Sequence, residues 1–186
     1  MFALTERLLL RPAWAEDADN VFRTIADEGI VRNLASAPWP YLPCHAQTWI
    51  ANPRPDHRPA SLIFLRTGGA PELVGCIGID SMPGGGVEMG YWIARQHWGT
   101  GIATEAGAAM LRFARDTLRL PRVIAGHFLD NPASGRVLRK LGFQPTGAVL
   151  MRSSLARGCE TPMAEFVLEL NREDDVPVAA CPKLAA

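Results

Sequence analysis

Two glycines, one residue apart, lie between a strand-like and a helix-like segment and constrain the fold more than any other feature. Gly99 and Gly101 follow the strand-like run 87–94, and a helical run begins at Ile102 and continues to about Leu118. Glycine allows turns in which successive N–H groups face one side, and a helix N-terminus adds unpaired donors and a positive dipole end. The pattern therefore predicts a main-chain cradle for a phosphate or diphosphate.

Two familiar phosphate-binding motifs do not account for this loop. A dinucleotide-binding fingerprint needs glycine or alanine at its sixth position, where Thr104 stands. A Walker A loop contains Gly-Lys-Ser/Thr, and the sequence has no such tripeptide. The pattern that does fit is Gln/Arg-x-x-Gly-x-Gly/Ala, which Gln96, Gly99 and Gly101 fill. The loop therefore resembles the pyrophosphate loop of the GNAT N-acetyltransferase superfamily, which binds the diphosphate of acetyl-coenzyme A (acetyl-CoA).

Three further blocks, in the family's order, extend the resemblance over residues 5–170. They are the opening 5–12, the strand-like 88–93 and the run 130–143. The first and last of these resemble signatures of the branch related to the ribosomal-protein alanine acetyltransferases, the RimJ/RimL-like branch. The resemblance implies an enzyme that transfers an acyl group, most simply acetyl from acetyl-CoA, to a primary amine on a protein N-terminus or a small molecule.

Residue periodicity and turn residues predict an α+β fold, with a mixed, mostly antiparallel central sheet of about seven strands flanked by about four helices. Asn131, Pro132 and Gly142 bound one helix as its N-cap, first residue and stop. The family resemblance implies that the fourth and fifth strands splay apart and that the pantetheine arm pairs with a free strand edge in the gap. The expected strands are 8–11, 61–66, 73–81, 87–94, 122–128, 144–151 and 163–170, and the expected helices are 16–28, 46–51, 102–118 and 132–141.

Composition narrows the classes of protein and partner. The 186 residues suffice for one domain, predicted over 1–171, and the acidic then Ala/Pro-rich 172–186 is expected to be a flexible tail. A formal net charge of zero gives no electrostatic case for nucleic acid or an anionic membrane as partner. With no long apolar run and no secretory signal, we expect a cytoplasmic protein. The four scattered cysteines are expected to be reduced thiols, and no metal site is predicted.

Acyl transfer to an amine needs a neutral amine, a donor for the oxyanion and a stabilised thiolate. Glu88, early in the strand beside the expected gap, is the candidate base, acting through water. The alternative is a surface glutamate that faces solvent or pairs with an arginine. The main-chain N–H groups near Met89 and Gly90 are candidates for the oxyanion donor, although Gly90 could instead only ease strand packing.

The run after the fifth strand supplies the other candidates. The resemblance implies that Asn131 contacts the cofactor and that Ser134 lies near its arm or sulfur. Asn131 could instead be a helix cap only, and the two roles are compatible. Many relatives carry a tyrosine acid where Leu138 stands, so Ser134 or water would have to assist the thiolate.

The expected contacts with acetyl-CoA or coenzyme A (CoA) involve the strand, the glycine loop, the start of the next helix and the later Asn-Ser pair. Trp39 and Tyr41, on a proline-rich loop, are expected to line the acceptor pocket with Glu88, and Trp49 and the loop 152–162 are expected near it. The aromatic residues could instead only close the core. The expected cofactor residues are Met89, Gly90, Tyr91, Trp92, Ile93, Gln96, His97, Trp98, Gly99, Thr100, Gly101, Ile102, Ala103, Thr104, Asn131 and Ser134.

Several alternatives stay open on the residues alone. Gln96 could only tie the turn together, His97 could face phosphate or water, and Trp98 could only pack. A non-catalytic CoA-binding sensor or scaffold is the rival function, and a nucleotide-binding protein is a third. Edge strands and apolar aromatic residues permit a homodimer without requiring one. The identity of the amine is not encoded in any motif found here.

Overall fold

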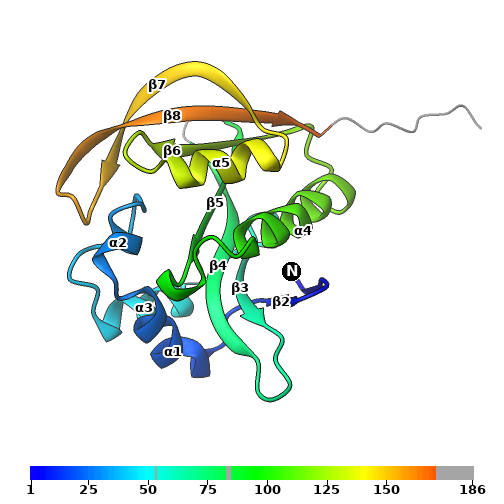
Figure 1. Ribbon diagram of the computed structural model, residues 1–186, viewed down its shortest axis with the longest axis vertical. Helices are drawn as coiled ribbons and strands as arrows, with labels where there is room; N and C mark the ends of the chain where they lie inside the picture. Colours follow the sequence, from blue (N-terminus) through cyan, green and yellow to red (C-terminus); the bar gives the residue numbers. More distant parts are fainter. Residues whose placement is uncertain (53, 83–84, 171–186) are drawn as a thin grey trace, which may run out of the picture.

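One mixed β-sheet organises the chain in the computed structural model, which describes residues 1–52, 54–82 and 85–170 (Figure 1). Within this described part the sheet has eight strands in the order β1-β2-β3-β4-β5-β6-β8-β7. The strands are β1 Ala3–Leu4, β2 Leu8–Arg11, β3 Ala60–Leu65, β4 Glu72–Ser81, β5 Val87–Ile93, β6 Arg122–Phe128, β7 Gln144–Ser154 and β8 Cys159–Glu169. The α-helices are α1 Ala18–Ile25, α2 Glu28–Val31, α3 Pro43–Ala51, α4 Ile102–Asp116 and α5 Pro132–Lys140.

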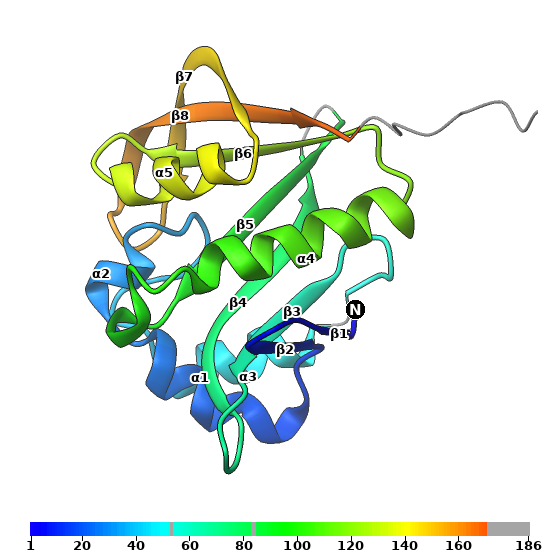
Figure 2. The same ribbon diagram turned by 45° about the vertical axis from the view of Figure 1, so that its right-hand side comes forward.

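Helices cover both faces of the sheet. Figures 1 and 2 show α4 and α5 on the same side of it, where apolar residues of α4 at helical spacing, such as Ile102, Ala106 and Met110, enter the larger core cluster. A second cluster, on the other face, joins residues of α1, α2 and α3 to Leu62, Phe64 and other strand residues. The expected mixed α+β architecture is confirmed.

The predicted splay lies between β5 and β6. These strands are parallel, and Glu88↔Ile124 is their one recorded pair within the described residues. On its other edge, β5 pairs with β4 along its whole length, from Ser81↔Val87 to Gly75↔Ile93. Within the described part of the chain, the edge of β5 that faces β6 therefore has no strand partner over 89–93, as the predicted strand addition requires.

The differences from the predicted elements are local. The two-residue β1 is too short to leave a periodic pattern, so the sheet has one strand more than expected. The predicted helix 16–28 is interrupted, because Ala26 has ψ 60° and Asp27 caps the separate helix α2 by accepting the Gly29 N–H at 2.7 Å. β7 continues to Ser154 instead of ending at 151. The predicted tail 172–186 lies outside the described residues.

A nearly buried ion pair stabilises the turn that leads from β2 into α1. Arg11 Nη1 and Nη2 donate to the two carboxylate oxygens of Asp17, each at 2.7 Å, and the guanidinium lies between the rings of Trp14 and Phe64. Burial alone would raise the pKa of Asp17, but the hydrogen bonds from Arg11 and the Trp14 N–H outweigh it and lower that pKa. The charged carboxylate is thus favoured by the native fold.

Asp17→Asn should lower the free energy of unfolding by about 3 kcal/mol, since it leaves Arg11 buried without its counter-charge. The melting temperature should fall by about 10 °C, measured by calorimetry. Because the folded pKa of Asp17 is lowered, the stability from this pair is present above the ordinary aspartate pKa of about 3.9 and is lost as pH falls through the lowered value. The exposed Asp19→Asn is the control, and equal melting temperatures for the two variants would contradict the prediction.

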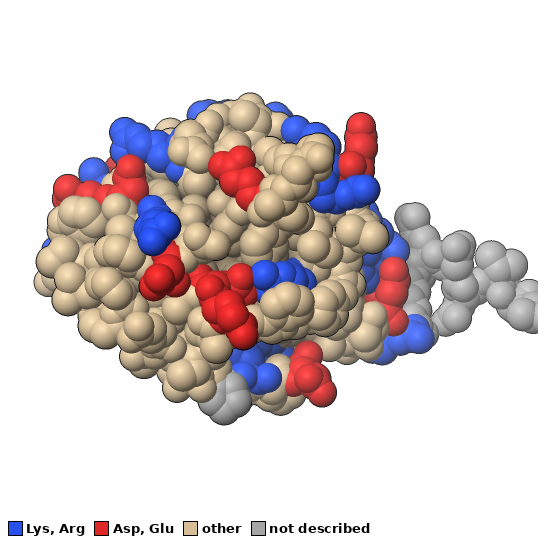
Figure 3. All heavy atoms as spheres, turned by 90° about the horizontal axis from the view of Figure 1, so that it is seen from below, with Lys and Arg blue, Asp and Glu red and all other residues tan. Residues whose placement is uncertain are grey.

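No described helix is both long enough and apolar enough to cross a membrane. On the face seen in Figure 3, acidic and basic side chains both occur among a larger uncharged area.

Candidate functional site

The glycine loop has the backbone conformation that a main-chain anion cradle requires. Gly99 and Gly101 have φ of 79° and 85°, which L-residues with side chains rarely adopt. Gly101 is the N-cap of α4, and no side chain caps that helix, so its first N–H groups keep their capacity for a ligand. Thr100 Oγ1 donates to the His97 carbonyl at 2.7 Å, which ties the loop to the short turn before it.

The N-terminal segment supports this loop through Arg7 and Glu105. Arg7 Nε donates to Glu105 Oε2 at 2.7 Å, and Arg7 Nη1 donates to the Thr100 carbonyl at 3.0 Å. Thr5 Oγ1 donates to Glu105 Oε1 at 2.6 Å. Burial would raise the pKa of Glu105, but Thr5 and Arg7 together lower it. Sequence reasoning gave Arg7 no role, because no local pattern signals a contact between residues 98 positions apart.

The side chains of Gln96 and His97 are turned toward the start of β4. Gln96 Nε2 donates to Glu72 Oε1 at 2.9 Å, and His97 Nε2 lies 3.0 Å from the same oxygen. The hydrogen bond from His97 lowers the pKa of Glu72, against the smaller effect of burial. The side chain of Gln96 thus contacts the start of β4, and that of His97 lies against the same carboxylate and is largely buried. The main chain of His97 is engaged as well, since its N–H donates to the Ala94 carbonyl at 2.9 Å and its carbonyl accepts from Thr100.

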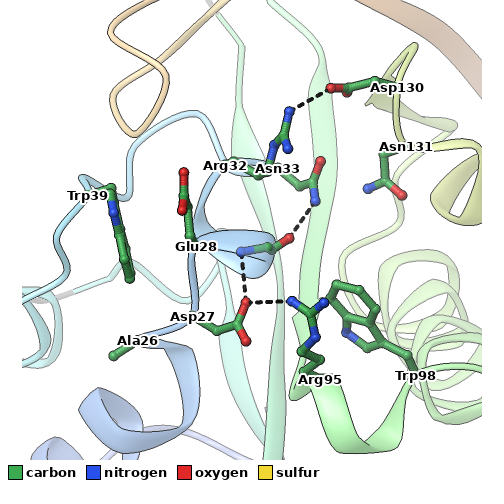
Figure 4. Close-up of a pocket in the computed structure, with 11 residues that line it drawn as sticks. Ala26, Asp27, Glu28, Arg32, Asn33, Trp39, Arg95, Trp98, Asp130 and Asn131 are labelled. Atoms are coloured by element: carbon green, nitrogen blue, oxygen red, sulfur yellow. Dashed lines mark hydrogen bonds and ion pairs between the residues drawn. The ribbon is translucent and has the colours of Figure 1, made fainter.

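A cavity of about 860 Å³ opens between α2, the segment after β5 and the start of α5 (Figure 4). Trp98 and Asn131, expected at the cofactor, line it together with Trp39, expected at the acceptor. Trp98 Nε1 donates to the Ile93 carbonyl at 2.7 Å, which fixes the indole at the cavity wall. The residues that line the cavity are Ala26, Asp27, Glu28, Gly29, Arg32, Asn33, Trp39, Arg95, Trp98, Asp130 and Asn131.

Tyr41 does not share this position. It is buried in the core cluster under α1 and α3, with its ring edge-on to His45. Burial raises the pKa of its hydroxyl to about 12. Tyr41 is therefore a core residue. Trp39, in contrast, lies on the cavity wall with 41% of its surface exposed.

Alternation along β5 sends the candidate residues to opposite faces of the sheet. Met89, Tyr91 and Ile93 face the core under α4, whereas Trp92 packs on the α1–α3 cluster. Glu88 is on the same face as Trp92 by this alternation. The side chains of Met89, Ile93 and Trp92 are engaged in packing. These residues can therefore contact a ligand only through their main-chain N–H and carbonyl groups.

Tyr91 meets the start of α5. Its Oη lies 2.8 Å from Ser134 Oγ, and the N-cap Asn131 Oδ1 accepts the Ser134 N–H at 3.4 Å. Burial raises the pKa of Tyr91 to about 12, although the hydrogen bond with Ser134 opposes it, so the phenol stays protonated at neutral pH. The predicted Asn131 and Ser134 are therefore brought together with Tyr91 at the splay.

Glu88 pairs with Arg152, the first residue of the segment 152–162 that was expected near the acceptor. Arg152 Nη2, from β7, donates to Glu88 Oε2 at 2.6 Å, and the two side chains are 33% and 19% exposed. Glu88 Oε1 has no hydrogen-bond partner among the described residues. Beside it, a Cβ added to Gly90 would meet no atom within 4 Å. The pairing alternative for Glu88 is thus observed, and one carboxylate oxygen still faces open space.

Three segments meet at the cavity rim around Asp130. Arg157 Nη1 and Nη2 each donate to Asp130 at 2.9 Å, and Arg32 Nη2 donates at 3.0 Å. Arg157 Nε also donates to the Arg32 carbonyl at 2.7 Å. The hydrogen bond from Arg157 lowers the pKa of Asp130, with burial opposing it. These contacts join α2, the β6–α5 turn and the β7–β8 hairpin.

Comparisons with known proteins agree with this architecture. Residues 7–144 match the family model described as an acetyltransferase (GNAT) domain. The chain is 30% identical over 152 residues to the uncharacterized N-acetyltransferase YoaA of Bacillus subtilis strain 168, covering 78% of this chain and 84% of that protein. A GNAT-family acetyltransferase from Bacillus anthracis has a TM-score of 0.77 at 21% identity, covering 91% of this chain and 99% of that one. The RimL ribosomal L7/L12 α-N-protein acetyltransferase, solved with CoA, has a TM-score of 0.71 at 17% identity, covering 90% and 97%.

Proposed function

Because the chain belongs to the GNAT acetyltransferase family, we propose that it transfers an acetyl group from acetyl-CoA to a primary amine by direct attack in a ternary complex. The observation that carries this is the unpaired edge of β5 over 89–93, which leads to the loop of Gly99 and Gly101 at the start of α4. The loop suits a diphosphate, and the edge suits the amide-bearing pantetheine arm. We also propose that the chain belongs to the RimJ/RimL-like branch, which the blocks 5–12 and 130–143 support.

The proposed chemistry assigns each proton and electron pair. Glu88, directly or through a water, takes a proton from the amine. The amine nitrogen then bonds to the carbonyl carbon, and the electron pair that moves to oxygen is stabilised by main-chain N–H near Met89 and Gly90. Collapse breaks the C–S bond, and the electron pair leaves on sulfur, to which Ser134 donates a hydrogen bond. The nitrogen loses its second proton in this step, and that proton ends on sulfur as the CoA thiol forms. This route needs no acyl-enzyme. Cys76 is a poor candidate for the nucleophile of one, because burial raises the pKa of its thiol to about 12.

A second function, a CoA-binding sensor without turnover, is favoured by Leu138. This residue stands where many relatives carry the tyrosine acid, and it is 1% exposed in the core. Incubation with acetyl-CoA and a panel of amines separates the two functions. Amine-dependent release of free thiol supports the transferase. Tight CoA binding without thiol release across a broad panel supports the sensor, and heat protection by ATP or NAD but not CoA would favour a nucleotide-binding protein.

Tyr91→Phe and Ser134→Ala should each lower turnover about 10-fold, and the double variant should be no slower than the worse single one. The reason is that the Tyr91 and Ser134 hydroxyls share one hydrogen bond, and only when Tyr91 is its donor does Ser134 keep its own proton free and oriented for sulfur. The two hydroxyls are therefore proposed to act as one unit. Steady-state rates of thiol release for the four proteins measure the coupling. Independent effects that multiply in the double variant would contradict a shared role.

A further inference from the structure

The pair Glu88–Arg152 retains hydrogen-bonding capacity that the fold does not use. A guanidinium has five N–H donors, and among the described residues Arg152 is recorded donating only through Nη2, to Glu88 Oε2. Glu88 Oε1 is likewise without a partner in the described part of the chain. A carboxylate and a guanidinium, each with free positions, therefore lie side by side.

This pair borders open space on the face of β5 that carries Glu88. A side chain at Gly90, the next residue but one, would meet no atom within 4 Å. Its neighbour across the sheet, Gly78, is different, because a Cβ there would lie 3.1 Å from the Pro59 carbonyl. The space is thus local to Gly90, where backbone can approach a ligand closely.

The paired charges select for an acceptor of complementary charge. An ammonium would hydrogen-bond to Glu88, and a carboxylate would accept from the planar fork of Arg152, the geometry that guanidinium groups favour. Because a 2.6 Å hydrogen bond joins Arg152 Nη2 to Glu88 Oε2, the unused positions belong to adjacent groups. An acceptor that reaches both groups suits them best when its two charges are close together, as in an α-amino acid. A polyamine would instead set a second cation near the guanidinium, at a cost in Coulomb energy.

Resting on the proposed function, we infer that the acceptor is a free α-amino acid, held as a zwitterion between Glu88 and Arg152. The ammonium lies on Glu88, where it loses its first proton, and the carboxylate lies on Arg152. The products are an N-acetyl amino acid and CoA thiol. Of the two protons that the nitrogen loses in all, one ends on sulfur and one is released to water.

The test compares acceptors with and without a carboxylate beside the amine, and each rate is expressed per neutral amine because the carboxylate also raises the pKa of that amine. With acetyl-CoA, kcat/KM is measured for alanine, alaninamide, ethylamine, γ-aminobutyrate and a tetrapeptide beginning with alanine. We expect alanine to exceed alaninamide by about 30-fold, from hydrogen bonds to a charged group. In Arg152→Met the ratio of alanine to alaninamide should fall to about 1. In Arg152→Lys it should be intermediate, because lysine keeps the positive charge but lacks the planar pair of guanidinium donors. Arg112→Met, on the exposed side of α4, is the matched control and should keep the full ratio.

The ratio within each variant cancels any general effect on folding or on Glu88. A wild-type ratio near 1, or one that Arg152→Met leaves unchanged, would overturn the inference while the transferase activity stands. A higher kcat/KM for the tetrapeptide than for alanine would overturn the inference in favour of a protein N-terminus. An equal kcat/KM for γ-aminobutyrate and alanine would show that the amine and the carboxylate need not be on one carbon atom. Failure of every amine to release thiol, with CoA still bound, would sink the proposed function itself.

Discussion

Replacing Gly101 by valine should weaken CoA binding by about 100-fold, which corresponds to about 2.7 kcal/mol. The residue has φ 85°, a conformation that strains a β-branched side chain by about 1–3 kcal/mol. Relief of that strain would rotate the peptide groups on either side, and with them the N–H donors proposed to hold the diphosphate. A Cβ here would also lie 3.4 Å from Arg7 Nη2, which supports the same loop. Titration calorimetry with CoA measures the loss.

The control for this variant matches its backbone strain but not its position. Gly147, in β7, has φ 83°, and a Cβ there would meet no atom within 4 Å. Gly147→Val should therefore lower the melting temperature as Gly101→Val does, by about 5 °C, and leave CoA affinity within about 2-fold. If both variants lost CoA affinity equally, or if Gly101→Val kept it, the main-chain cradle would not be the CoA site.

Replacing Glu88 by glutamine should lower turnover by about 100- to 1,000-fold near neutral pH, with CoA affinity almost unchanged. Glutamine keeps the size of the side chain and a hydrogen bond to Arg152 but cannot take a proton. The defect should shrink as pH rises above the pKa of the acceptor amine, because the acceptor then arrives neutral. That pKa is about 8 for the α-amine of a peptide and higher for a free amino acid, whose carboxylate favours the ammonium. A profile of kcat/KM against pH measures this trend.

The exposed Glu169, at the far end of β8, provides the control Glu169→Gln, which should follow the wild-type profile. Turnover by Glu88→Gln equal to wild type at every pH would remove Glu88 from the base role. A uniform loss at all pH values would indicate instead that the carboxylate only holds Arg152 in place. The pH trend is therefore the discriminating result.

Local sequence patterns predict most of the fold because they act over short distances. Alternation and glycine turns locate β3, β4 and β5, and Asn131 and Gly142 bound α5 within a residue. The break between α1 and α2 was missed, since the apolar spacing of 16–28 continues through Ala26 while the backbone there leaves the helix. The sequence left two positions open for Tyr41, the acceptor pocket and the core. Whether one aromatic residue of a loop is buried depends on tertiary packing, which local patterns do not specify.

The candidate site is less predictable, since its contacts join distant parts of the sequence. Tyr91 and Ser134 are 43 residues apart, and Glu88 and Arg152 are 64 apart. Each residue type was visible, but no periodicity or motif specifies which strand brings them together. The glycine loop is the exception, because strand, turn and helix N-terminus are contiguous and carry their geometry in one short stretch.

The arginine contacts around Asp130 have a consequence for engineering this protein. Arg32 and Arg157 reach that carboxylate from segments 98 and 27 residues away. A chimera that took only the β7–β8 hairpin from a homologue would lose the bidentate partner and leave Arg32 to satisfy the charge alone. An exchange of segments with a homologue should therefore include all three segments, so that Asp130, Arg32 and Arg157 come from the same protein.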